Sequence, residues 1–291
     1  MRKLTHWITK SSSAAVVAGG VMLSSVVGIA SVESGLGAPV PSSLAESGTR
    51  PMGDLDTGPA TSTRVVVESA PPTIALYGDS LAWEAHDYFV WFAVERGWEP
   101  EVHVFGGTAP CDWNDELAAD LLDPPDLVVV AFSGNSLTDC MVDPTTGEHF
   151  EGTRHTEKYR ADVGWFAESA AAAGSRVAIV APPVSASGGG AKFHAVYQEI
   201  ARLNGGDFVD GGAAIAPAGV HTPTMPCFLD EHPSLGCIDG RIRVRAADGG
   251  HFCPTDPVAV NGVTPTCPVY ASGARRYAEH LLSAIEQGTS L

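Results

Sequence analysis

The feature that most constrains the fold is the run Asp-Leu-Val-Val-Val-Ala-Phe at residues 126–132, in which only the first residue is polar. A continuous apolar, β-branched run is typical of a strand buried on both faces of a parallel sheet. Parallel strands need crossover connections, which are usually helices. The sequence around this run should therefore alternate between strands and helices.

Hydrophobic periodicity, with Gly and Pro as stop signals, predicts that alternation. Strands are predicted at residues 73–77, 101–105, 126–132, 176–181 and 208–209. Helices are predicted at residues 81–96, 115–122, 157–173, 192–203 and 273–286. A polar loop is expected at 142–155, and a long Pro- and Cys-containing segment at 211–245. The repeated strand–helix order predicts an α/β fold with an open, doubly wound sheet.

The N-terminal region is expected to lie outside this fold. Residues 1–30 combine a basic start with a small-residue apolar run, which predicts a signal peptide or, alternatively, an uncleaved N-terminal anchor. Residues 31–71 are rich in Ser, Gly, Pro and Ala, as in a flexible linker. The predicted catalytic domain then spans 72–287, and the protein is expected to be secreted or associated with the cell envelope.

The charge of the chain argues against one class of partner. The formal net charge is −17, and cleavage after Ala30 would remove three basic and no acidic residues, giving −17 − 3 = −20. So acidic a protein should repel nucleic acid and anionic lipid. Nucleic acid is therefore excluded as a partner, and no protein partner is predicted.

Six cysteines fit an oxidising compartment. Six cysteines permit about 15 pairings, and sequence alone does not choose among them. The pairing favoured here is Cys111–Cys140, Cys227–Cys237 and Cys253–Cys267, because the last two close short loops. The alternative is a metal site that uses cysteines with His232 or His251. The absence of a Cys-x-x-Cys pair argues against it.

Ser80 is the candidate nucleophile. It lies in Gly78-Asp79-Ser80-Leu81, directly after the first predicted strand and at the start of a predicted helix. Unpaired N–H groups and the helix dipole favour developing negative charge at that position. A nucleophilic serine needs such a setting. The alternative is a simple helix N-cap.

Two further positions follow the next two strands. Gly107 follows the second strand and Asn135 the third, and the carboxyl ends of parallel strands meet at one edge of the sheet. The backbone N–H groups of Ser80 and Gly107, with the Asn135 amide, could together stabilise a tetrahedral oxyanion. Turn formation is the alternative explanation for each residue taken singly.

His251 is the candidate general base. Among the ten histidines, only His251 has an aspartate three residues before it, Asp248. The carboxylate could hold one imidazole nitrogen and leave the other to accept the Ser80 proton. The alternative is that Asp248-Gly249-Gly250 forms only a turn.

The four motifs, in this order, resemble the conserved blocks of a GDSL-type member of the SGNH hydrolase superfamily. The blocks are residues 78–81, 106–108, 133–135 and 248–251, and the resemblance spans about 72–287. It implies a three-layer, flavodoxin-like sandwich with a five-stranded parallel sheet, and serine esterase chemistry without metal or cofactor. The third block usually reads Gly-x-Asn-Asp, whereas Ser133 and Ser136 stand at its ends here.

The resemblance also implies a role for each matched residue. Ser80 would be the nucleophile and, with Asn135 and Gly107, an oxyanion donor; Gly106 is the alternative to Gly107, which fits the pattern better. His251 would be the base, oriented by Asp248.

The sequence thus predicts a serine esterase that hydrolyses carboxylic esters of a small or lipid-like acyl group through an acyl-Ser80 intermediate. The expected substrate is a small-molecule, lipid or acylated-glycan ester. Activity should fall at acid pH, as His251 becomes protonated.

Two alternatives remain. One is an O-acyltransferase or deacetylase acting on cell-envelope glycan with the same residues, and the other is a non-catalytic SGNH-like binding module. A glycosidase is disfavoured because the adjacent Asp230 and Glu231 have no evident opposing carboxylate.

Overall fold

The computed structural model describes residues 70–255 and 267–288. The predicted signal peptide at 1–30, and the predicted linker up to residue 69, lie outside the described residues. The strands are β1 (Thr73–Gly78), β2 (Glu99–Val104), β3 (Leu127–Ala131), β4 (Arg176–Ala181), β5 (Asp207–Asp210), β6 (Thr224–Pro226) and β7 (Arg241–Arg243). The α-helices are α1 (Ser80–Glu95), α2 (Asn114–Asp120), α3 (Gly152–Ala173), α4 (Ala191–Leu203) and α5 (Ser272–Gly288).

Five strands form one parallel sheet in the order β2-β1-β3-β4-β5. The predicted five-stranded parallel sheet is therefore confirmed. After β2 the chain crosses to the other side of β1, so the strand order reverses between β1 and β3. Ligands bind beyond the carboxyl ends of the strands at such a reversal.

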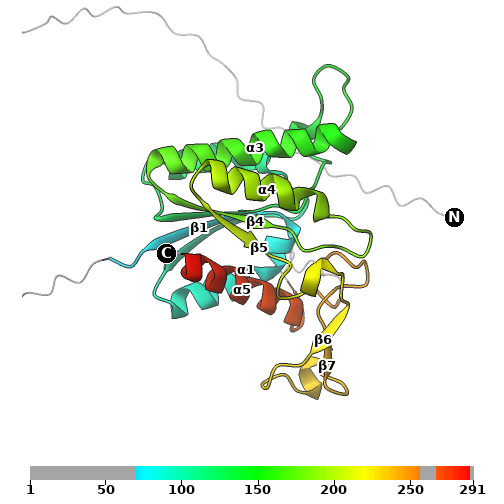
Figure 1. Cartoon of the computed structure of the whole chain (residues 1–291). Coiled ribbons are helices and arrows are strands. Elements are labelled where there is room, and N and C mark those ends of the chain that lie inside the picture. The colour runs from blue at the N-terminus through cyan, green and yellow to red at the C-terminus, as the bar shows by residue number, and fades with distance from the viewer. Residues whose placement is uncertain (1–69, 256–266, 289–291) are drawn as a thin grey trace, which may run out of the picture. The chain divides into compact units, whose positions relative to one another are not determined.

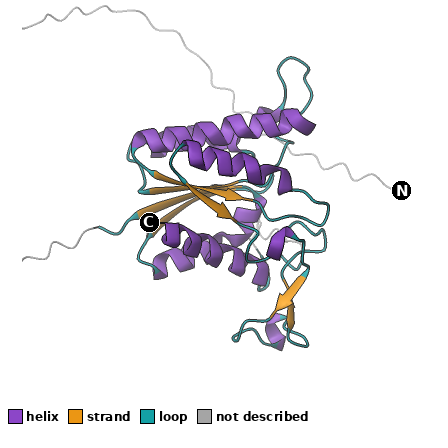
Figure 2. Ribbon diagram, in the orientation of Figure 1, coloured by secondary structure: helices purple, strands orange, loops and turns teal. Residues whose placement is uncertain are grey.

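Helices cover both faces of the sheet and give three layers (Figures 1 and 2). On one face α1 and α5 lie side by side and bury Leu76, Val129 and Phe89 in a single cluster. On the other face α3 and α4 bury Val128 and Val130. The side chains of β3 thus enter both clusters, which explains why this strand is apolar without alternation.

The strand register aligns the three motifs that follow β1, β2 and β3. Gly78, the last residue of β1, pairs with Val104 of β2 and with Ala131 of β3. Ser80, Gly106 and Ser133 each stand two positions beyond one of these paired residues. The register therefore delivers the three motifs to the same edge of the sheet.

Only glycine fits at the end of β1. A Cβ atom on Gly78 would lie 2.3 Å from the Ala82 Cβ and 2.8 Å from the Ala131 carbonyl oxygen. The missing side chain lets helix α1 turn back closely over β1 and β3. This close approach sets where the first residue of the helix, Ser80, lies.

The predicted loop at 142–155 is wrong in its last four residues, because α3 begins at Gly152. His155 is 5% exposed, and its ring lies against those of Tyr159 and Phe193. Its Nδ1 is 2.8 Å from the Lys192 Nζ. Packing against α4 therefore extends the helix through residues that look polar in the sequence.

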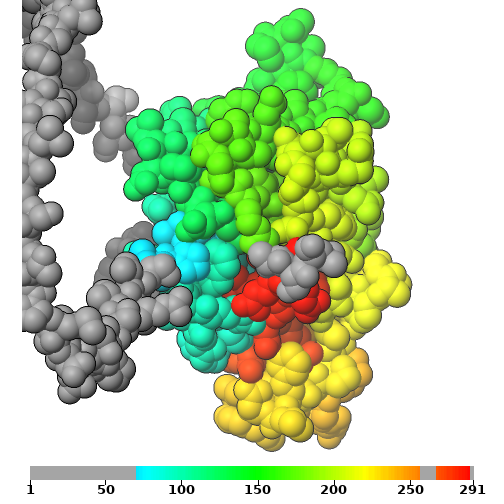
Figure 3. Space-filling view, turned by 60° about the vertical axis from the view of Figure 1, so that its left-hand side comes forward, coloured from blue at the N-terminus to red at the C-terminus, as the bar shows by residue number. Residues whose placement is uncertain are grey.

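The segment after β5 contains a short hairpin that the sequence did not predict. Strands β6 and β7 pair in antiparallel fashion, and Figure 3 shows the yellow surface of this segment beside red helix α5. Arg276 of α5 donates to the Pro226 carbonyl oxygen at 2.8 Å and to Glu231 Oε2 at 3.0 Å. Arg275 Nη1 is 2.8 Å from Asp230 Oδ2. Asp230 and Glu231, the pair considered for a glycosidase, thus pair with arginines of α5.

The six cysteines pair as predicted. The disulfides are Cys111–Cys140, Cys227–Cys237 and Cys253–Cys267. In the described ranges, no helix has the length and apolar character needed to cross a bilayer.

Candidate active site

Ser80 is the first residue of α1 and follows β1 after a single intervening residue. That residue, Asp79, is the N-cap, and its Oδ1 accepts from the Leu81 backbone N–H at 3.2 Å. The N–H of a first helical residue has no acceptor within its own helix. Ser80 therefore combines a half-buried hydroxyl with the positive end of the helix dipole.

The structure brings Ser80, His251 and Asp248 together. The His251 Nε2 is 2.9 Å from the Ser80 Oγ, although the two residues are 171 positions apart in the chain. The His251 Nδ1 is 2.5 Å from Asp248 Oδ2. With Nδ1 protonated toward the carboxylate, Nε2 is left as an acceptor for the serine proton.

The aspartate is itself held by backbone donors. Asp248 Oδ1 accepts from the N–H groups of Gly250 at 2.8 Å and His251 at 3.0 Å. Although partial burial opposes it, these bonds and the His251 ring lower the pKa of Asp248 to about 2. Asp248 is therefore ionised at neutral pH.

The basicity of His251 is set by opposing effects. Burial alone would lower the pKa of its imidazole. The hydrogen bond that His251 donates to Asp248 and the negative charges of Glu84, Asp248 and Asp79 outweigh burial and raise that pKa above 6.5. The surroundings thus favour the imidazolium form of His251, the form it would take on accepting a proton from Ser80.

Asp79 joins the first motif to the third. Its carboxylate is fully buried, and Oδ2 accepts from the Ser133 N–H at 2.5 Å, the Ser133 Oγ–H at 2.7 Å and the Asn135 amide at 3.1 Å. Burial raises the pKa of Asp79, and the bonds from Ser133 and Leu81 oppose the shift. The hydroxyl of Ser133, which departs from the usual third block, is thus a donor to the buried carboxylate.

Asn135 lines the same cavity as Ser80, but its amide is already engaged. The Nδ2 atom donates to Asp79 Oδ2 and also to the Thr108 carbonyl oxygen, both at 3.1 Å. An amide nitrogen carries two hydrogens, so both are used in this conformation. To donate to an oxyanion, the Asn135 amide has to break its hydrogen bond to the Thr108 carbonyl oxygen.

The second motif lies next to Ser80 through Gly106. A Cβ atom built on Gly106 would be 3.9 Å from the Ser80 Cβ. Gly107 is exposed, has φ of +86°, and is not among the residues that line the cavity at Ser80. The structure thus places Gly106 beside the serine, with Gly107 one residue further along the loop.

The cavity at Ser80 has a volume of about 160 Å³. Besides Ser80, Asn135 and His251, it is lined by Leu81, Ser133 and Gly250, and by the 182–190 loop through Pro182, Pro183, Ser185, Gly189 and Gly190. The loop is tied to the base motif because the Ala186 N–H donates to the Gly249 carbonyl oxygen at 3.0 Å. Sequence reasoning missed this wall, which contains no chemically reactive side chain.

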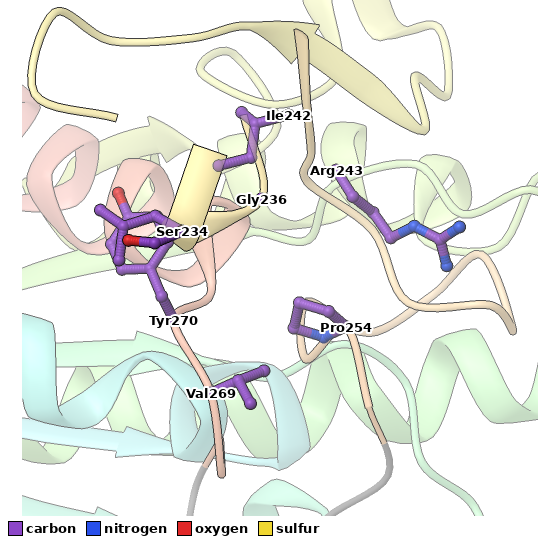
Figure 4. Close-up of a pocket in the computed structure, with 8 residues that line it drawn as sticks. Ser234, Gly236, Ile242, Arg243, Pro254, Val269 and Tyr270 are labelled. Atoms are coloured by element: carbon purple, nitrogen blue, oxygen red, sulfur yellow. The ribbon is translucent and has the colours of Figure 1, made fainter. Parts of the chain in front are cut away.

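A second cavity of about 370 Å³ lies between the hairpin segment and the residues just before α5. Ser234, Gly236, Ile242, Arg243, Pro254, Val269 and Tyr270 line it (Figure 4). Pro254 is only three positions after His251. None of the predicted site residues lines this cavity.

Two side chains that sequence reasoning missed hold the segment around His251. Glu84 is 5% exposed, and its Oε2 accepts from the backbone N–H groups of Phe252 at 2.6 Å and Cys253 at 3.1 Å. Arg245 is 1% exposed and donates to the carbonyl oxygens of Gly250 at 2.8 Å and Val184 at 3.2 Å. The only sequence signal for Glu84 is a charge within the apolar stripe of α1.

Two groups of side chains within the described residues have the donor atoms to hold a metal ion. One is Glu84 with Cys253 and Cys267, but these cysteines form a disulfide and so offer no thiolate. The other is Glu101, His103 and Asp120, in which the His103 Nε2 is 2.8 Å from Asp120 Oδ2. Neither group contains His232 or His251, the histidines considered for a metal site.

Neither a protein-family profile nor a curated protein sequence matches this chain. Solved structures that are similar to it include TesA, with 16% identity, a TM-score of 0.44, and coverage of 74% of this chain and 98% of that one. A putative GDSL-like lipase from Parabacteroides merdae is 13% identical, with a TM-score of 0.44 and coverage of 74% and 96%.

A variant of Axe2, an acetyl-xylooligosaccharide esterase from Geobacillus stearothermophilus, is also 13% identical, with a TM-score of 0.47 and coverage of 74% and 94%. At such distances the chemistry of this chain has to be argued from its own site. That site is a serine, a histidine and an aspartate in hydrogen-bond contact at the carboxyl edge of an open parallel sheet.

Proposed function

We propose that this chain is a serine esterase of the SGNH type. The observation that carries the proposal is the continuous contact from Ser80 Oγ to His251 Nε2, at 2.9 Å, and from His251 Nδ1 to Asp248, at 2.5 Å. A hydroxyl with an adjacent oriented base is the arrangement that activates a serine nucleophile.

In the proposed reaction, the Ser80 oxygen attacks the ester carbonyl while His251 takes the hydroxyl proton. The helix N-terminus and the Asn135 amide stabilise the oxyanion. His251 then returns its proton to the departing alcohol, which leaves an acyl-Ser80 ester. A water molecule, deprotonated by His251, attacks that ester, and the proton passes back to Ser80 as the acid leaves.

The cavity supports a small acyl group. At about 160 Å³ it is smaller than the roughly 300 Å³ at which drug-sized ligand sites begin, and most of its lining residues are Ser, Gly and Pro. A long alkyl chain would extend beyond a cavity of this size. The substrate proposed is therefore a short-chain ester of a small molecule or glycan.

Export of the protein is part of the proposal. Three disulfides support folding in an oxidising compartment. A secretory signal in residues 1–30 is consistent with that.

Intact-mass analysis after treatment with a fluorophosphonate tests the nucleophile directly. The expected result is one adduct on the oxidised protein, no adduct on Ser80→Ala, and hydrolysis of p-nitrophenyl acetate by the untreated protein. Oxidised, folded protein that forms no adduct would reject the esterase and favour a binding module. An adduct without hydrolysis would favour acyl transfer, which product analysis with a sugar acceptor then tests.

A further inference from the structure

Glu84 lies one helical turn after Ser80, on the buried side of α1. Residues four apart on a helix are neighbours on one face. The carboxylate is only 5% exposed, although a charged group in such a place is costly unless its hydrogen bonds are made. Those bonds come from the Phe252 and Cys253 N–H groups, which directly follow His251 in the chain.

These bonds join the two halves of the reacting pair. Glu84 belongs to the helix that begins with Ser80, and its Oε2 atom accepts from the backbone segment that directly follows His251. The 2.6 Å bond to the Phe252 N–H links residues 168 positions apart. The Cys253–Cys267 disulfide restrains the same segment.

We infer that Glu84 is a positioning residue: its hydrogen bonds to the backbone after His251 fix that histidine against Ser80 and place a buried negative charge near the base. This inference rests on the proposed esterase function for its kinetic consequences. It has two parts, one geometric and one electrostatic, and different variants test each part.

The charged groups around His251 come from four parts of the chain. Glu84 is on α1, Asp79 is in the turn before α1, and Asp248 is in the loop of His251 itself. Arg245 is the cation of the neighbouring segment, and its guanidinium bonds to the Gly250 carbonyl oxygen rather than to the ring. The 182–190 loop has no ionisable side chain. Among these groups, Glu84 is the carboxylate that also holds the backbone after His251.

Glu84→Gln tests the electrostatic part. Its amide oxygen can still accept from both N–H groups, but the charge is gone. The expected kcat/KM profile with p-nitrophenyl acetate keeps its plateau at high pH, while its acid limb moves to lower pH. Glu95→Gln, which removes an exposed charge from the end of the same helix, should leave the limb in place. A Glu84→Gln limb that coincides with that of the unaltered protein overturns the electrostatic part.

Glu84→Asp tests the geometric part. It keeps the charge but is too short by one methylene group to hold both N–H groups. The expected result is a plateau kcat that is lower by about ten- to a hundredfold, with KM and the acid limb little changed. An unchanged kcat overturns the geometric part. Since Glu84→Asp retains the buried charge, it also decides the geometric part if Glu84→Gln does not fold.

A second readout does not depend on activity. The imidazole of His251 can be titrated by NMR, with its signal assigned by its loss in His251→Ala. The expected midpoint in Glu84→Gln is lower than in the unaltered protein, and equal midpoints overturn the electrostatic part. If the unaltered protein forms no fluorophosphonate adduct, the proposed function fails while this titration still tests how Glu84 acts on His251.

Discussion

The two sides of the Ser80 hydroxyl differ in how completely they are assembled. On the base side, the Asp248 carboxylate accepts from the His251 ring and two backbone N–H groups, and Glu84 accepts from two more. On the oxyanion side, Gly107 is exposed and both hydrogens of the Asn135 amide are bound to internal acceptors. The proposed base side is already hydrogen-bonded in full, whereas the Asn135 amide has to give up a partner before it can donate to an oxyanion.

The difference follows from the charge of the acceptors. Carboxylates accept short, charge-assisted hydrogen bonds, which are stronger than those between neutral groups. They can therefore fix the residues of the base side before any substrate binds. The bond from Asn135 to the Thr108 carbonyl is neutral and can be exchanged for an oxyanion at little cost. The electrostatic gain of that exchange would then appear only as charge develops on the substrate.

Removing the reacting pair should have the largest effect. Ser80→Ala and His251→Ala are each expected to lower kcat/KM for p-nitrophenyl acetate by about 10⁴-fold or more. The serine hydroxyl and the imidazole act as one unit, so losing either side chain removes the activated nucleophile. For the same reason, the double variant should be no worse than either single one. A double variant whose loss is the product of the two single losses would contradict the contact seen between these side chains.

Asp248→Asn should break the base side without removing a reacting group. Without the carboxylate, the imidazole tautomer is no longer held, and kcat should fall by about 10³- to 10⁴-fold. Asp248 raises the His251 pKa, so the loss of its charge lowers that pKa. The acid limb of the kcat/KM profile should then move to lower pH. In the unaltered protein the limb should lie above 6.5, because only neutral His251 accepts a proton. A limb that stays in place in Asp248→Asn would contradict this electrostatic account.

Asn135→Ala tests the oxyanion side alone. Losing one oxyanion donor typically costs about 10²- to 10³-fold in kcat, and KM should change little. The acid limb should stay where it is, because Asn135 is not among the groups that set the His251 pKa. Circular dichroism should verify the fold, since Asp79 loses a donor. A shifted limb would show that the two sides are not independent.

Ser133→Ala should have the smallest effect on activity. It removes the hydroxyl donor to buried Asp79 and keeps the backbone N–H. The expected loss is about 1–3 kcal/mol of unfolding free energy in urea, with kcat within about tenfold, because hydrogen bonds to charged groups contribute on that scale. Ser136→Ala, in the same loop, is the matched comparison. Equal stability of the two variants would mean that the Ser133 hydroxyl does not stabilise Asp79.

Local patterns in the sequence determined the sheet and singled out the candidate catalytic residues. The apolar run at 126–132 predicted a strand buried on both faces, and β3 is that strand. The Gly-Asp-Ser turn after the first strand, and the Asp three residues before His251, singled out the three side chains now seen in contact. These signals are readable because each depends on neighbours within a few positions.

Tertiary structure alone decided how those residues are held. Asp79 and Ser133 are 54 positions apart, and Glu84 and Phe252 are 168 apart. The helical start of α3 likewise depends on α4, which buries His155. A carboxylate in an apolar stripe, or a serine where the motif expects glycine, has no partner within its own stretch of sequence. Only the folded chain supplies the donors that make its burial favourable, and for that reason these residues had to be found in the structure.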